Sequence, residues 1–143
     1  MKKPSIRLAV VLIALTSPLL FAQEASTSKP PAFKAHVLTV PELDALLAKP
    51  DHVLLLDVRR PDEVTSIGGF PVYLSVQASD LEKSLAWIPK DRTIVTVSNH
   101  AGRAGKAADL LSSKGFKVAG AVGAETYEKE GGKIAHVKAP AAK

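Results

Sequence analysis

Residues 93–103 read TIVTVSNHAGR: a run of β-branched residues is followed at once by a polar turn and a basic residue. Threonine, isoleucine and valine favour strands, and the next segment, 103–113, places alanine and leucine at helical spacing. A second run, VLLLD at 53–57, is apolar up to its last residue, as in a strand that is buried on both faces. The two stretches predict neighbouring parts of a parallel sheet with helices packed against it.

The rest of the chain alternates in the same way between strand and helix patterns. Thr39 and Glu42 have the spacing of a capping box, so a helix is expected from there to Lys49. Further strands are expected at 36–40, 72–76 and 117–122, and further helices at 79–87 and 125–130. This alternation predicts an α/β fold with a parallel sheet of about five strands and helices on both faces. Trp87 is expected in the core.

The N-terminus has the organisation of a secretory signal peptide. The basic residues Lys2, Lys3 and Arg7 precede the apolar run 8–20, which is shorter than the ~20 residues that a membrane-spanning helix needs. Cleavage is expected after Ala22, with an uncleaved anchor as the alternative. The chain then divides into a signal peptide (1–22), a flexible leader (23–35), one folded domain (36–137) and a disordered tail (138–143). An exported protein is predicted, periplasmic or secreted, that meets a membrane only transiently through its signal peptide.

Composition excludes several kinds of chemistry. The chain contains no cysteine and its single methionine is Met1, so the processed protein would carry no sulfur. Thiolate catalysis, disulfides and thiolate metal sites are excluded. The four histidines show no ligand spacing, so neither a metal nor another cofactor is expected. Without the three basic residues of 1–22, the net charge falls from +5 to +2, which is too low to predict nucleic-acid binding.

Two polar segments follow strands, at the edge of a parallel sheet where ligands usually bind. One begins at Asp57; the other, here called the 98–103 loop, leads directly into a helix and consists of Ser98, Asn99, His100, Ala101, Gly102 and Arg103. The N–H groups and the dipole of a helix start favour an anion. The 98–103 loop is therefore predicted to bind an anion, with Arg103 either contacting the anion or solvated.

Asp57 and Arg59 are predicted to support this loop. Asp57 is expected to be a structural carboxylate that ties loop backbone together. Arg59 and its neighbour Arg60 are expected to pair with Asp62 or Glu63, or to lie at the rim of the site.

At these two segments the chain resembles the rhodanese-like domains. Members of that family carry Asp-Val-Arg-x-Pro-x-Glu after a strand, and residues 57–63 read DVRRPDE. Their active-site loop has the form Cys-x-x-Gly-x-Arg and opens a helix, as SNHAGR does here at 98–103. The resemblance covers roughly residues 36–131 and implies a rhodanese-like sheet. In this alignment Ser98 occupies the position of the family cysteine, and Ala101 that of the loop glycine.

The substitution at Ser98 changes the function that the resemblance implies. Sulfur transfer in the family passes through a persulfide on a thiolate, which a serine hydroxyl cannot form. The chain is thus predicted to be a pseudoenzyme of the sulfurtransferase family that binds a small oxyanion, such as sulfate or thiosulfate, or a protein partner through the 98–103 loop. The alternative is a sulfurtransferase-family enzyme or a weak hydrolase that uses Ser98, with His100 as the base nearest in sequence.

Overall fold

A computed structural model of the chain describes residues 32–136. The predicted signal peptide, most of the predicted leader and the predicted tail lie outside the described residues. Among the residues that are described, no helix combines the length and the apolar composition needed to cross a membrane.

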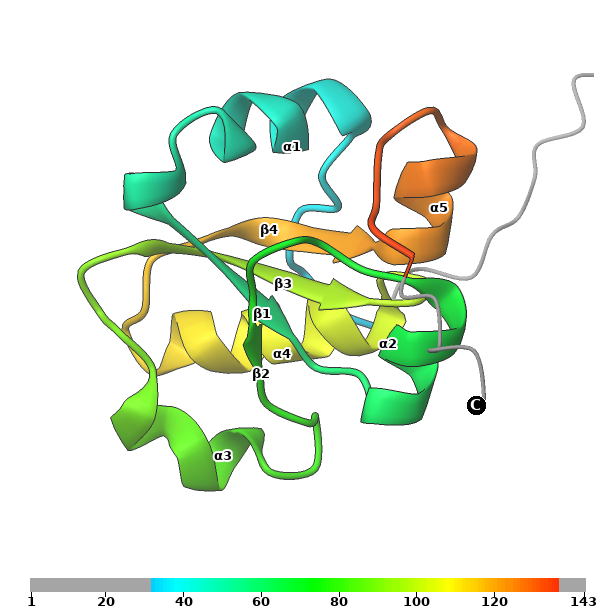
Figure 1. The fold of residues 1–143 in the computed structure, drawn as a ribbon. Helices are drawn as coiled ribbons and strands as arrows, with labels where there is room; N and C mark the ends of the chain where they lie inside the picture. The colour runs from blue at the N-terminus through cyan, green and yellow to red at the C-terminus, as the bar shows by residue number, and fades with distance from the viewer. Residues whose placement is uncertain (1–31, 137–143) are drawn as a thin grey trace, which may run out of the picture.

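The centre of the molecule is a parallel sheet of four strands in the order β2-β1-β3-β4 (Figure 1). The strands are β1 (Val53–Asp57), β2 (Leu74–Ser75), β3 (Thr93–Ser98) and β4 (Val118–Gly123). β1 pairs with β3 along its whole length, from Val53 opposite Thr93 to Asp57 opposite Val97. Both runs that decided the sequence-based fold are thus central strands, which confirms the α/β class.

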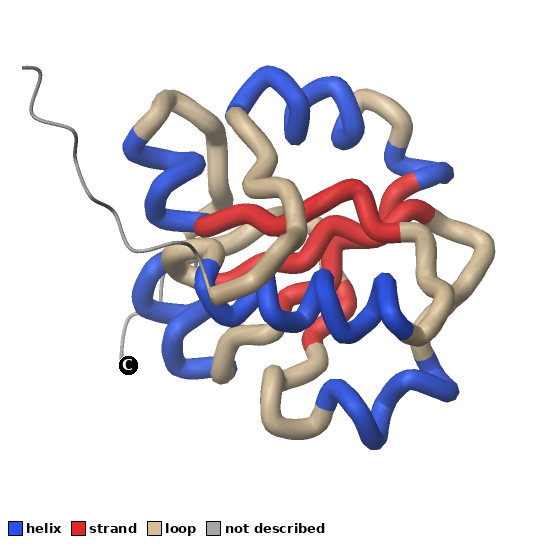
Figure 2. Tube along the Cα trace, turned by 180° about the vertical axis from the view of Figure 1, so that it is seen from behind, coloured by secondary structure: helices blue, strands red, loops and turns tan. Residues whose placement is uncertain are grey.

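Helices cover both faces of this sheet (Figures 1 and 2). On one side lie α1 (Val40–Leu47) and α5 (Ala124–Lys129), and on the other α3 (Leu81–Ser84) and α4 (Gly102–Ser113). A fifth helix, α2 (Pro61–Ile67), follows the carboxyl end of β1, and two single 3₁₀ turns span Pro50–His52 and Leu85–Trp87. Alternate strand residues enter the two layers: Leu55 packs in the α1 and α5 core, and Leu56 in the α3 and α4 core.

The expected fifth strand at 36–40 is reduced to a single bridge beside β4. Val37 pairs with Ala121, and the Leu38 N–H donates to the Ala121 carbonyl at 2.9 Å. The chain then leaves the sheet because α1 begins at Val40: the Glu42 carboxylate accepts the Thr39 N–H at 2.8 Å, which is the capping contact expected from the sequence. The sheet therefore has four strands rather than about five.

Two further features differ from the sequence-based expectation. Helix α2 was not expected; it is short, and Val64 is its only buried residue, so it carries almost no apolar periodicity. Trp87 was expected in the core but is 84% exposed. Its neighbour Ile88 is buried instead, because the 3₁₀ turn at the end of α3 directs Ile88 toward the sheet and Trp87 toward solvent.

The residues that lead into α1 run along α4 (Figure 2). The Phe33 ring lies over Gly105, where a Cβ atom would have no room. The Lys34 N–H donates to the Asp109 carboxylate at 2.7 Å, and Ala35 packs against a small cluster that includes Ala108. Residues 33–35, the last part of the predicted leader, are thus packed on the domain.

Candidate functional site

A buried ion pair lies where β1 ends. The Asp57 carboxylate accepts the Arg59 Nε–H at 3.0 Å and the Nη2–H at 2.7 Å, and both side chains are fully buried. Asp57 also accepts the Arg59 backbone N–H at 3.1 Å, so the carboxylate holds both the side chain and the chain turn that follows the strand. Arg59 does not reach Asp62 or Glu63; it is Arg60, outside the core, that pairs with Asp62 at 3.0 Å.

Arg59 extends from this pair toward two other segments. Its Nη1–H donates to the Gly68 carbonyl, at the end of α2, at 2.9 Å. The same group lies 3.5 Å from the side-chain oxygen of Asn99 in the 98–103 loop. Arg59 therefore connects β1, the end of α2 and the loop from the interior, which is a structural role and not a rim charge.

Ser98 is the last residue of β3 and is buried beneath the loop. Its hydroxyl oxygen accepts the backbone N–H of Ala104, in the first turn of α4, at 3.0 Å. The hydroxyl thereby satisfies one of the N–H groups that a helix start leaves without an intrahelical acceptor. Where the alignment places a nucleophile, this chain has a helix-capping group.

The loop closes through an unusual backbone conformation at Ala101. Its φ is +51°, the left-handed region that L-residues rarely adopt, and it is the only non-glycine residue with positive φ among those described. The loop also packs tightly on the end of β4: a Cβ atom on Gly123 would lie 2.8 Å from the Asn99 carbonyl oxygen. That carbonyl accepts the Glu125 N–H at 3.2 Å, which ties the loop to α5.

Several backbone N–H groups of the loop have no acceptor among the described residues. These are the N–H groups of Asn99, His100, Ala101 and Arg103, whereas Gly102 donates to the His100 carbonyl. A residue in the left-handed conformation next to a right-handed one is the backbone arrangement that forms anion-binding concavities. The main chain of the loop thus offers donors to a ligand.

The side chain expected to contact an anion is already paired. Arg103 donates two hydrogen bonds to the Glu63 carboxylate of α2, from Nη1 at 2.7 Å and from Nη2 at 2.6 Å. Glu63 also accepts the Asn99 amide at 2.8 Å and the Arg60 backbone N–H at 3.0 Å, and its side chain is only 13% exposed. The hydrogen bonds from Arg103 are the main reason why the pKa of Glu63 is lowered to about 2.

Glu63 contacts the 98–103 loop, but the sequence-based prediction did not include it among the site residues. It was considered only as a partner of Arg59 or Arg60, yet it holds the 98–103 loop from the outside while Arg59 holds it from the inside. The available signal was its place in the DVRRPDE stretch, two residues after Pro61 at the start of α2.

Among residues 32–136, no histidine or carboxylate side chain hydrogen-bonds with the Ser98 hydroxyl. The His100 side chain is 74% exposed and its Nε2 lies 3.6 Å from the Glu125 carboxylate. The Ser98 hydroxyl has its hydrogen bond with Ala104 and none with His100. Within residues 32–136, no group of three or more histidine, aspartate or glutamate side chains is placed to hold a metal ion.

The strained residue gives a stability prediction. Replacing Ala101 by glycine removes the Cβ atom that disfavours positive φ, so we expect the free energy of unfolding to rise by about 1 kcal/mol. The control is Ala45→Gly, at an exposed position inside α1, where glycine should instead lower the stability by about 1 kcal/mol. Urea unfolding followed by circular dichroism measures the free energy of unfolding of both variants. Equal destabilisation by the two changes would contradict the interpretation that Ala101 is strained.

The pairing of Glu63 predicts a pH dependence. Because the pKa of Glu63 is about 2 in the folded protein and lies near its ordinary value of 4.5 in the unfolded chain, the carboxylate stabilises the fold fully above pH 4.5. This contribution is lost as the pH falls toward 2. The stability difference between wild type and Glu63→Gln should therefore shrink between pH 5 and pH 2. Urea unfolding at several pH values in this range tests it, and a constant difference would contradict the ion pair.

Comparisons with known proteins identify the family and agree with the fold. The family model described as "Rhodanese-like domain" matches residues 39–123, and no curated protein matches the chain. A rhodanese-related protein from Thermoplasma volcanium has a similar structure, with a TM-score of 0.62, 20% identity, and coverage of 70% of this chain and 97% of the other.

Two further solved structures are similar. For a rhodanese-like domain protein from Staphylococcus aureus the TM-score is 0.59 and the identity 19%, over 71% of this chain and 98% of the other. For reduced CoADR-RHD from Bacillus anthracis the TM-score is 0.60 and the identity 26%, over 67% of this chain and 17% of the other. Sequence motif, family model and fold agree, and the chain belongs to the rhodanese-like domain family while containing no cysteine.

Proposed function

We propose that this protein is a non-catalytic rhodanese-like module that binds a small oxyanion, such as sulfate or thiosulfate, at the 98–103 loop. The observation that carries the proposal is the set of loop N–H groups that have no acceptor among the described residues. They belong to the residues that follow Ser98, whose buried hydroxyl stands where the resemblance places a reactive thiol. The signal-peptide pattern of residues 1–22 supports a location outside the cytoplasm.

The composition of the chain and the geometry around Ser98 both support a non-catalytic role. A persulfide requires a thiol, and the chain has none. Hydrolysis by Ser98 requires a base that takes its proton, but the hydroxyl is buried against the Ala104 N–H and His100 is turned to solvent beside Glu125. These observations favour the non-catalytic proposal over both enzymatic alternatives.

The charge of the loop sets the expected strength of binding. Glu63 neutralises Arg103, so an anion would be held mainly by neutral backbone donors. The Glu63 carboxylate also repels an anion at the loop, which offsets the attraction of the Arg103 guanidinium. We therefore propose weak, main-chain recognition of an oxyanion. Docking of a protein partner at the same loop stays a prediction from the sequence.

Binding is tested by titrating sulfate and thiosulfate into ¹⁵N-labelled protein and following the amide resonances. Signals of Asn99, His100 and Ala101 should shift. In Glu63→Gln the guanidinium of Arg103 is released from its carboxylate, and the affinity should rise by about tenfold or more, because one hydrogen bond to a charged group contributes about 1.5–3 kcal/mol. Arg103→Ala, which leaves Glu63 unpaired beside the loop, should weaken binding.

The matched control is Glu42→Gln, which removes the same charge from the start of α1. It should leave the oxyanion affinity within a factor of about two, the size of a screened long-range effect. The proposal fails if the loop amides do not respond to either anion, or if Glu63→Gln and Glu42→Gln have the same affinity.

Introducing a thiol at position 98 tests whether the loop can support sulfur transfer. Wild type should show no thiosulfate:cyanide sulfur transfer, whereas Ser98→Cys should gain measurable activity, because the Ala104 N–H and the helix start would stabilise a thiolate there. Ser112→Cys places a thiol on the exposed far end of α4 and should stay inactive. Activity in wild type would contradict the proposal; silence in Ser98→Cys would show that the closed loop excludes the donor.

A further inference from the structure

A second concave site lies away from the 98–103 loop, on the side of the sheet that α1 and α5 cover. It is a cavity of about 440 Å³, inside the range of about 300–1,000 Å³ that small-molecule sites occupy. Its walls come from the end of α1, the first half of β1, the segment before β2 and α5. They include Leu47, Val53, Leu55, Phe70, Pro71 and Tyr127. No residue of the 98–103 loop lines it.

The cavity exists because β2 is short. β2 pairs only with Leu56 and Asp57, so the first half of β1 has no neighbouring strand on that side. The chain at 70–73 crosses in front of β1 without pairing to it (Figure 1). The space between this segment, β1 and α1 is lined mainly by aliphatic and aromatic side chains. At its edge, Val72 is 82% exposed.

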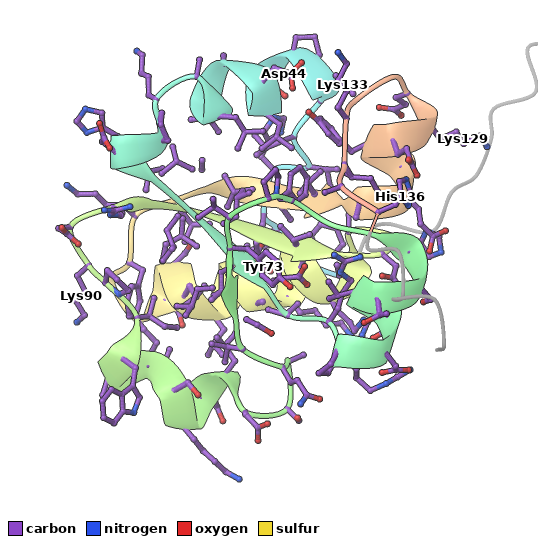
Figure 3. The ribbon with its side chains drawn as sticks, viewed as in Figure 1. Asp44, Tyr73, Lys90, Lys129, Lys133 and His136 are labelled. Atoms are coloured by element: carbon purple, nitrogen blue, oxygen red, sulfur yellow. The ribbon has the colours of Figure 1, made fainter. Side chains whose placement is uncertain are left out.

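The charged residues of the lining are all cationic. They are Arg92, just before β3, and Lys133, in the segment after α5; Figure 3 shows Lys133 on the α1 side of the sheet. Neither forms an ion pair with any of the residues that are described, and no carboxylate lines the cavity. Asp44 does not line the cavity; its carboxylate accepts a hydrogen bond from the hydroxyl of Tyr127, which does line it.

We propose that this cavity binds an amphipathic organic anion: an apolar chain or ring that carries a carboxylate or sulfonate. The apolar walls would take the hydrocarbon part by removing it from water. Arg92 or Lys133 would pair with the anionic group at the edge. An inorganic oxyanion would gain nothing from the walls, so this site is distinct from the one proposed at the 98–103 loop.

Octanoate and its neutral counterpart 1-octanol form a probe pair. Both can place a hydrocarbon chain in the cavity, but only octanoate can also pair with Arg92 or Lys133. In ¹⁵N-labelled full-length protein, octanoate should shift the amides of Val72, Tyr73 and Arg92 and leave those of the 98–103 loop in place. The double change Arg92→Gln and Lys133→Gln should weaken octanoate binding at least fivefold and leave 1-octanol binding within twofold. The double change Lys83→Gln and Lys106→Gln removes two exposed cations from α3 and α4 and should change neither.

Val72 supplies a second, independent test at a position whose exposure makes misfolding no concern. Val72→Asp should weaken octanoate binding at least fivefold, whereas Val72→Lys should preserve it. The proposal is overturned if octanoate shifts no amide of the cavity, if the two Val72 variants bind it equally, or if 1-octanol binds wild type as tightly as octanoate does. Because the probes and the responding amides differ, these results do not depend on oxyanion binding at the loop.

Discussion

The buried pair of Asp57 and Arg59 is the interaction on which the carboxyl edge of the sheet depends. It fixes a fully desolvated guanidinium at the end of β1, from which the Gly68 carbonyl and the Asn99 side chain are within reach. A buried ion pair adds little net stability, yet loss of one partner leaves an uncompensated charge that costs about 3–5 kcal/mol. Within the described residues no buried side-chain polar atom lacks a hydrogen bond, so the pair is fully accommodated. Its role is to specify where α2 and the loop lie.

A second ion pair, nearer the surface, holds the 98–103 loop from the outside and sets its net charge. Glu63 and Arg103 join α2 to α4 across the loop that Arg59 holds from within. The same contact that orders the loop cancels its positive charge. The chain thus keeps the rhodanese-like fold, while the Ser98 hydroxyl caps the helix and the Arg103 guanidinium is paired with Glu63.

The sequence predicted those parts of the fold that rest on local patterns. The run at 53–57 is aliphatic up to Asp57, the run at 93–98 is rich in β-branched residues, and the capping residues of α1 are three apart in the chain, so each carries its own signal. Helix α2 carries almost none, with one buried residue, and was missed. In the site, the position of the loop was predicted, but the pairing of Arg103 with Glu63 joins residues 40 apart and depends on how α2 is placed. Trp87 was misplaced because a tryptophan beside a buried isoleucine has no pattern that assigns its side.

The packing of Phe33 on Gly105 bears on where the folding unit begins. The region that the family shares runs from 39 to 123. A fragment cut to those limits would lose the Phe33 ring and the Lys34 contact with Asp109, and at the other end the antiparallel bridge between Gly69 and Ala135. The surface of α4 at Gly105 would then be exposed to solvent. The backbone N–H and carbonyl of Gly69, just after α2, would lose their hydrogen bonds with Ala135 and be exposed to water. Packed residues of this chain therefore extend beyond the matched range 39–123 at both ends.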